Sequence, residues 1–257
     1  MPIPKTSSYE FKEHLISLGL QEGQNLAIHS NMTTFGKLER GVENAYHIIR
    51  SVIGEKGTIV VPTYTTDLSK GEAYDPKTSP AQNMGVFSNY ILNREGSVRT
   101  PSPLQSHAIE GPLKDKLLKA NHNHSMGPGS IFEIMLHENF DLLLLGCSFH
   151  EGATFIHHVE ASVGVSYRKW LNLKRKVVCP NGSIKQVTIR YYGLTKNSGL
   201  KTDLKTIQCL LQDSGSCLLV SINHGASRII SLKTLFEDTS RLLSEQPNIL
   251  MVPEQNE

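Results

Sequence analysis

Residues 150–160 gather the side chains of this sequence that are best suited to chemistry. They read His-Glu-Gly-Ala-Thr-Phe-Ile-His-His-Val-Glu, and residues 153–162 contain no helix breaker. In a helix, His157 and Glu160 lie three positions apart on one face, while His158 points elsewhere. An imidazole beside a carboxylate makes a general base, because the carboxylate fixes the tautomer and stabilises the imidazolium. The spacing therefore predicts a base formed by His157 and Glu160.

Other interpretations of this segment remain open. Acidic residues near a helix N-terminus are favoured by the helix dipole without any chemical role. Clustered histidines and carboxylates also suit a metal, but His150 and His157 are seven positions apart, whereas two ligands on one helical turn need a spacing of four. We therefore expect no metal. Cys147 is a further nucleophile candidate, although a cysteine in such a place is typically a small apolar filler.

Two more segments follow apolar strands, and ligands of open α/β sheets bind beyond the carboxyl ends of the strands. Residues 30–36, Ser-Asn-Met-Thr-Thr-Phe-Gly, are rich in hydroxyl groups and backbone donors ahead of a helix. This composition suits a phosphate or a pantetheine amide, and it is equally typical of an ordinary strand–helix turn. Residues 63–67 follow the next strand, and we assign Tyr64 and Asp67, together with His150, to the substrate side.

The elements that would position these groups alternate along the chain. Short apolar strands are predicted at 25–30, 58–63 and 141–146, and a helix at 42–53 joins the first two. Strands that are apolar on both faces are typical of a parallel sheet covered by helices. Ser7 and Glu10 have the spacing of a capping box, and Ser130 is the expected cap of a later helix. Further helices are predicted at 85–92, 113–120, 130–136, 153–162, 203–211 and 232–243, and a last strand at 217–222.

The architecture changes around Asn181-Gly182. Residues 174–192 alternate on both sides of this pair, which is a strong hairpin signal. The predicted fold class is therefore α/β, with a mixed, mainly parallel central sheet flanked by helices and an antiparallel hairpin excursion near 171–195. We expect a single domain over residues 1–257, in which residues 171–195 form at most a small subdomain.

Composition narrows the class of protein. Apolar residues make up 39% and charged residues 19% of the 257 residues, which excludes disordered and coiled-coil chains. No apolar run approaches the length of a membrane span, and residues 1–10 lack the apolar core of a secretory signal. The four cysteines form no CxxC pair. A cytoplasmic protein without membrane contact is expected.

The charge of the chain is unevenly distributed. A net charge of +2 excludes a strongly basic nucleic-acid binder, yet residues 168–205 contain ten basic residues, from Arg168 to Lys205 and including Lys196, against one acid. Such a patch suits a phosphorylated partner, while a solvated basic face on the hairpin is the plainer interpretation.

Two polar segments in the middle of the chain carry weaker signals. Residues 99–111 are interpreted as a loop between helices, and long loops of this type often line a site. His122 and His124 precede Ser130 and favour a helix entry over a metal site.

Taken in order, these segments give the chain a resemblance to the aminoglycoside 3-N-acetyltransferase family, which transfers acetyl from acetyl-coenzyme A to an amine. The resemblance spans nearly the whole chain, and the ordered set of motifs is fairly specific although each motif alone is weak. The matching motifs are residues 26–30, Gly36, residues 57–63, Met84-Gly85, residues 99–111, Gly127 with Ser130, residues 143–146 and Thr154-x-x-His157-x-x-Glu160, with a faint C-terminal match at Gly225-Ala226 and Arg228.

The resemblance implies a role for each part of the site. His157 would be the base at the acceptor amine, with Glu160 in its family position and Glu151 where the family usually has an aspartate. Acetyl-coenzyme A would be the co-substrate, and thioester aminolysis needs no metal. The donor side would be bordered by Ser30, Asn31, Met32, Thr33, Gly36, Ser102 and Ser106.

Departures from the family pattern bear on the acceptor. Ser102-Pro103 stands where the family has His-Pro, and one extra residue lies between Gly146 and His150. Polycationic aminoglycosides need an acidic pocket, whereas this chain is net basic, so we expect a less cationic amine: an amino sugar, a sugar nucleotide or a biosynthetic intermediate. Two alternatives are a catalytically degenerate binding protein of the same fold and a metal-dependent hydrolase that uses His150, His157 and Glu160.

Overall fold

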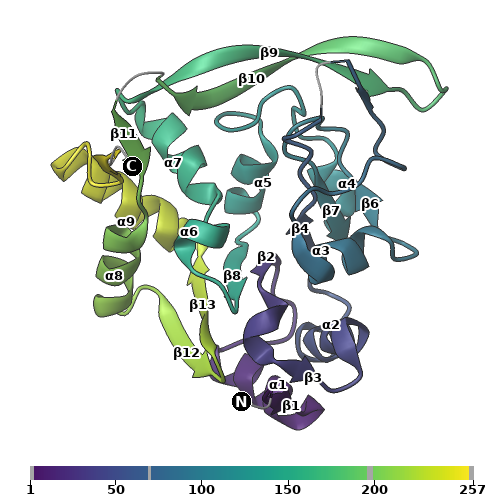
Figure 1. The fold of residues 1–257 in the computed structure, drawn as a ribbon, viewed down its shortest axis with the longest axis vertical. Coiled ribbons are helices and arrows are strands. Elements are labelled where there is room, and N and C mark those ends of the chain that lie inside the picture. The colour runs from purple at the N-terminus through teal and green to yellow at the C-terminus, as the bar shows by residue number, and fades with distance from the viewer. Residues whose placement is uncertain (1–2, 69–70, 196–198, 255–257) are drawn as a thin grey trace.

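A seven-stranded mixed sheet forms the centre of the computed structural model, which describes residues 3–68, 71–195 and 199–254 (Figure 1). Lys196 of the basic segment lies outside these ranges. The mixed sheet predicted from the sequence is confirmed, with parallel pairs at β8–β2–β4 and antiparallel pairs on either side. In spatial order the strands are β12 (Leu218–Ile222), β13 (Gly225–Ser231), β8 (Asp141–Leu145), β2 (Leu26–Ser30), β4 (Ile59–Pro62), β7 (His107–Glu110) and β6 (Val98–Arg99).

Helices cover both faces of this sheet and create two apolar cores. Leu26 and Ile28 of β2 enter one core, and Ala27 between them enters the other. This alternation explains why consecutive positions of the central strands, such as Leu26–Ile28, are apolar, as a covered parallel sheet requires. One core is closed by α1 (Ser8–Ser17), the 3₁₀ helix η1 (Met32–Phe35), α2 (Gly41–Ile53) and α3 (Gly85–Leu92). The other is closed by α4 (Lys114–Leu117), α5 (Ile131–His137), α6 (Phe149–Gly152), α7 (Phe155–Val163), α8 (Lys205–Asp213) and α9 (Leu232–Glu245).

Most predicted elements are found within a few residues of their expected bounds, but several strands of the fold were not predicted. The Ser7–Glu10 capping box at the start of α1 is confirmed by both of its hydrogen bonds. The loop expected at 99–111 is wrong in part, because β7 pairs antiparallel with β4 there and β6 pairs with β7. Strand β13 was not predicted either, and it joins β12 to β8. Ser130 occupies the N-cap position of α5 without making a side-chain cap bond.

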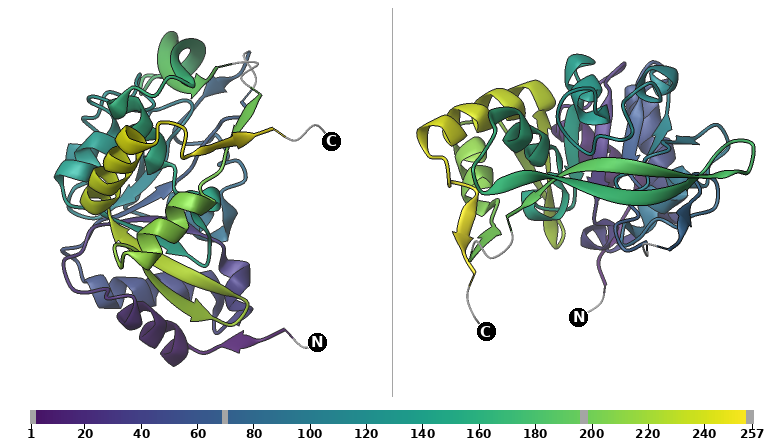
Figure 2. Two further views of the ribbon diagram at one scale, coloured as in Figure 1. Left: turned by 90° about the vertical axis from the view of Figure 1, so that its left-hand side faces the viewer. Right: turned by 90° about the horizontal axis from the view of Figure 1, so that it is seen from above.

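A long two-stranded ribbon arches over one end of the molecule, as Figure 1 shows. It consists of β9 (Arg168–Val178) and β10 (Ile184–Leu194), which confirms the predicted antiparallel hairpin. Seen from above in Figure 2, it runs across the width of the molecule. The ribbon is attached along its length, since β5 (Ala73–Tyr74) adds to β9 and the Arg190 amide donates to the Asn123 carbonyl at 2.7 Å. Two small sheets complete the fold, β1 (Lys5–Thr6) with β3 (Lys37–Leu38) and β11 (Leu200–Thr202) with β14 (Met251–Pro253).

Across the described ranges, no helix is both long enough and apolar enough to cross a membrane.

Three histidines are buried between the helices and the sheet. His14 Nε2 lies 2.8 Å from Ser227 Oγ, and His158 Nδ1 accepts from the Gly127 amide at 3.1 Å. Burial lowers the pKa of His14 and of His158 to about 4, and burial lowers that of His107 to about 3. All three side chains are therefore neutral in the folded protein at neutral pH.

Because these histidines regain an ordinary pKa near 6.5 on unfolding, the unfolded chain binds more protons than the folded one below that pH. The free energy of unfolding should therefore be highest above pH 6.5 and fall as the pH drops toward 4. His14→Gln keeps a hydrogen-bond donor near Ser227. It should reduce the slope of the free energy of unfolding against pH by up to about 1.4 kcal/mol per pH unit. Urea unfolding at pH 7, 6 and 5 measures it, and His47→Gln, at an exposed position of α2, is the control. An unchanged slope in His14→Gln would contradict this prediction.

Candidate active site

A cavity of about 450 Å³ opens at the carboxyl ends of β2 and β4 and beside the residues that follow β8. This is the edge at which open α/β sheets bind ligands, as the sequence predicts. The helix α3 begins at its wall. The lining residues are His29, Ser30, Asn31, Met32, Thr33, Pro62, Asn83, Met84, Gly85, Val86, Cys147 and Glu151.

Glu151 reaches this cavity from the short helix α6. Its carboxylate accepts from the backbone and the hydroxyl of Ser148, both at 2.7 Å, in a capping box, and from Asn31 Nδ2 at 3.3 Å. Burial acts to raise the pKa of Glu151, but these hydrogen bonds outweigh it and leave the pKa below its usual value. Glu151 therefore presents a negative charge at the cavity at neutral pH.

The turn between α6 and α7 is pressed against β2. A Cβ atom on Gly152 would lie 2.6 Å from His29 Cβ, so only glycine fits this contact. Thr154 follows as the N-cap residue of α7. The close approach fixes the end of α6 against β2, and α7, which carries His157, begins at Phe155. Neither His157 nor Glu160 is among the described residues that line the cavity.

His157 and Glu160 meet on α7 as their spacing predicts. His157 Nδ1 lies 2.6 Å from Glu160 Oε2. The carboxylate is fully buried, whereas the His157 side chain keeps 27% of its surface exposed. An ionised carboxylate only accepts hydrogen bonds, so Nδ1 carries the proton and Nε2 of the neutral ring has a free lone pair.

Two further groups complete the surroundings of Glu160. Arg168 Nε lies 2.7 Å from Oε2, and the Tyr167 hydroxyl donates to Oε1 at 2.9 Å. Burial acts to raise the pKa of Glu160, but the contacts with His157, Arg168 and Tyr167 outweigh it, so the pKa is lowered. Glu160 is therefore a buried carboxylate with partners on both oxygens, as a buried charge requires.

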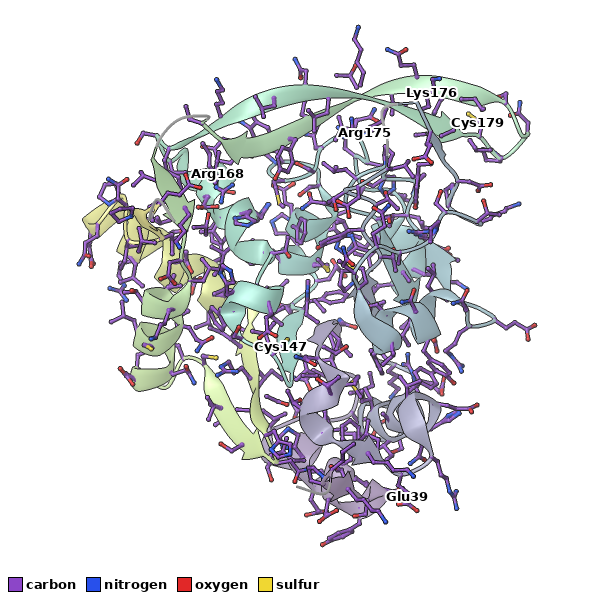
Figure 3. All side chains as sticks on the ribbon, in the orientation of Figure 1. Glu39, Cys147, Arg168, Arg175, Lys176 and Cys179 are labelled. Carbon is purple, nitrogen blue, oxygen red and sulfur yellow. The ribbon has the colours of Figure 1, made fainter. Side chains whose placement is uncertain are left out.

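Neither of these two partners is predicted from the sequence. Arg168 belongs to the basic segment expected on the surface, but its side chain is only 4% exposed and lies at the base of the ribbon beside α7 (Figure 3). The turn between α7 and β9 brings Tyr167 and Arg168 to Glu160, and the spacing of residues in the sequence does not predict this turn. Asn83–Val86 of the cavity wall were likewise not singled out, except for Met84-Gly85 in the family motif.

The residues expected to border coenzyme A are found in two settings. Ser30, Asn31, Met32 and Thr33 line the cavity. Gly36 has a φ of 66°, and a Cβ atom there would lie 2.2 Å from the Pro4 carbonyl oxygen, which gives it a structural role in the turn. Ser102 and Ser106 are both buried, and Arg99 Nε donates to Ser106 Oγ at 3.2 Å.

The three residues expected on the substrate side lie in different environments. Tyr64 is buried, with its ring edge-on to His107 at 5.3 Å between centroids. Asp67 lies on the surface, where its amide donates to Gln82 Oε1 at 2.8 Å. His150 is exposed on α6, next to Glu151.

The alternative chemistries find less support. Burial raises the pKa of the Cys147 thiol to about 12, so it is not a thiolate at neutral pH, in keeping with an apolar filler. Within the described ranges, no three histidine, cysteine or carboxylate side chains gather closely enough to hold a metal ion.

Comparison with known proteins identifies the family. Residues 27–244 match the family described as aminoglycoside 3-N-acetyltransferase. Aminoglycoside N(3)-acetyltransferase III of Salmonella sp is 24% identical over 198 residues, covering 70% of this chain and 69% of that protein. Aminoglycoside N(3)-acetyltransferase IX of Micromonospora chalcea is 27% identical over 195 residues, covering 68% of each. Among solved structures, AAC-IIIb in a binary complex with coenzyme A superimposes with a TM-score of 0.80 at 17% identity, over 95% of this chain and 98% of that one. With the family matched over most of its length, this chain is an N-acetyltransferase-like enzyme that belongs to the aminoglycoside 3-N-acetyltransferase family.

Proposed function

We propose that the protein transfers an acetyl or similar acyl group from acyl-coenzyme A to the amine of a small molecule, with His157 as general base. The observation that carries the proposal is the His157 Nδ1 contact with the buried Glu160 carboxylate, 2.6 Å long. Bound acetyl-coenzyme A supplies the activated carbonyl carbon. His157 Nε2 removes the proton from the attacking amine as the N–C bond forms, and the C–S electron pair leaves with the thiol sulfur.

The donor side of the proposal rests on the loop that follows β2. Asn31 Oδ1 accepts from the amide and hydroxyl of Thr33, at 3.3 and 2.6 Å, which holds the loop in shape. Ser30 Oγ is buried at the cavity and has no hydrogen-bond partner within the described part of the chain. A free hydroxyl and a cavity of about 450 Å³ suit the amides of a pantetheine arm. The structurally similar AAC-IIIb has been solved in a binary complex with coenzyme A, which supports coenzyme A as the donor.

The acceptor side of the proposal rests on Glu151. Its ionised carboxylate at the cavity suits one ammonium group of the acceptor, with His150 beside it and Tyr64 and Asp67 assigned to the same side. A polycation needs several carboxylates, whereas Glu151 is the one carboxylate among the described residues that line this cavity. We therefore propose an acceptor less cationic than the aminoglycosides: an amino sugar or a related biosynthetic intermediate.

The base assignment predicts a large loss of turnover in His157→Ala. We expect kcat/KM to fall roughly 10²-fold or more with the fold retained, which is the usual contribution of a positioned general base. Release of thiol from acetyl-coenzyme A is the measurement, with the best acceptor from a screen of amino sugars, nucleotide amino sugars and aminoglycosides.

The matched control is His47→Ala, on the exposed face of α2, which should retain wild-type turnover. If His157→Ala turns over as fast as this control, the base is another group, and His150 is the next candidate. If no amine in the screen releases thiol while coenzyme A still binds, the degenerate binding protein is the better interpretation.

The donor assignment predicts that coenzyme A stabilises the protein against heat. A ligand at about 100 times its dissociation constant adds roughly 2.7 kcal/mol to the free energy of unfolding. Thr33→Trp should abolish the shift in Tm, because the indole fills the loop. The Tm of the free protein should fall only slightly, because Thr33 is exposed and loses one exposed hydrogen bond, from its hydroxyl to Asn31 Oδ1.

Thr188→Trp, at an exposed position on β10, is the matched control and should keep the full shift. Thermal unfolding with and without millimolar coenzyme A measures both variants. A full shift in Thr33→Trp would show that this loop is not part of the donor site.

A further inference from the structure

We propose that Arg168 is a positioning residue of the site: it neutralises the buried Glu160 carboxylate so that His157 stays an unprotonated base instead of being held as an imidazolium. The proposal deepens the proposed function, because it rests on His157 as the base. It concerns a side chain that acts through Glu160 and has no contact of its own with substrate.

The geometry places two nitrogen atoms against a single carboxylate oxygen. His157 Nδ1 and Arg168 Nε lie 2.6 and 2.7 Å from Glu160 Oε2. Arg168 is itself held from the other side, since its NH2 group donates to the Thr202 hydroxyl on β11 at 3.0 Å. A guanidinium that is 4% exposed and anchored at both ends has little freedom to leave the carboxylate.

The balance of charge gives Arg168 its function. A buried carboxylate with no permanent cation would stabilise a proton on His157 strongly, because the resulting ion pair is poorly screened. Arg168 supplies that cation permanently, so that proton uptake by His157 adds a second positive charge to a pair that is already neutral. Arg168 thereby opposes protonation of Nε2, while the Glu160 carboxylate still fixes the proton on Nδ1.

The other titratable groups around α7 do not provide this balance. Tyr167 donates to Glu160 Oε1 as a neutral hydroxyl, and burial raises its pKa. Tyr192 on β10 donates to the Val165 carbonyl at 2.9 Å, and burial raises its pKa also. Helices α5 and α9 pack against α7. The charges of Glu133 and His137 on α5 influence the pKa of His158. On α9, Arg241 forms ion pairs with Asp238 and Glu245.

The test is the titration of the His157 ring by NMR in the free protein, with its signals identified by their loss in His157→Ala. Arg168→Met removes the charge and should raise the titration midpoint by about one pH unit or more. Arg168→Lys keeps the charge and should leave the midpoint within about 0.3 units, and Glu160→Gln should lower it. Arg175→Met, farther along the same strand (Figure 3), is the matched control and should leave the midpoint unchanged.

An unchanged midpoint in a folded Arg168→Met protein would overturn the proposal. If that variant does not fold, because Glu160 is then buried without its cation, the comparison moves to Glu160→Gln and Glu160→Gln/Arg168→Met, which leave no unpaired buried carboxylate. The double variant should titrate at a higher pH than the single one, and equal midpoints would overturn the proposal. These measurements need no acceptor, so a raised midpoint together with full activity in His157→Ala would reject the proposed base and retain the role of Arg168.

Discussion

A negative charge buried in the interior is the constraint on which the site depends. Glu160 has no exposed surface, and a carboxylate in such a place is stable only if its oxygens are hydrogen-bonded and its charge is balanced. Its partners come from one helix and from the start of the next strand, so α7 and β9 have to dock in a single arrangement. The requirement for pairing thus fixes the orientation of the exposed imidazole.

The same requirement links the site to the end of the chain. Arg168 donates a hydrogen bond to Thr202 on β11, and β11 pairs with β14, which ends at Pro253. A basic residue that sequence composition assigns to the surface is therefore interior and joins three parts of the fold. Most of the remaining cations of the ribbon, such as Lys174 and Lys176, are exposed, and the ribbon keeps the solvated basic character expected from the sequence.

Local signals predicted the parts of the fold that depend on local physics. The apolar strand at 141–145 and the Asn181-Gly182 hairpin can each be predicted from a few neighbouring residues. The same holds for the shared helix face of His157 and Glu160. β7 was not predicted because it begins at His107, and a polar residue at that position favours a loop. Its strand conformation depends on antiparallel pairing with β4, which the local sequence does not indicate. The contacts of Arg168 and of Asn83 with the site were beyond reach for a related reason. Both residues reach the site through contacts between segments that are distant in sequence. Local sequence patterns do not predict such long-range contacts.

The turn between Glu151 and His157 is fixed by packing. Gly152 lies against His29 of β2 with no space for a Cβ atom, and α7 begins at Phe155. Glu151 is held by the capping box on one side of this turn, and His157 by Glu160 on the other. One carboxylate thus faces the cavity with a full negative charge, while the other has its charge cancelled by Arg168. Under the proposed function, the first is suited to hold an ammonium ion and the second to leave an imidazole free to deprotonate it.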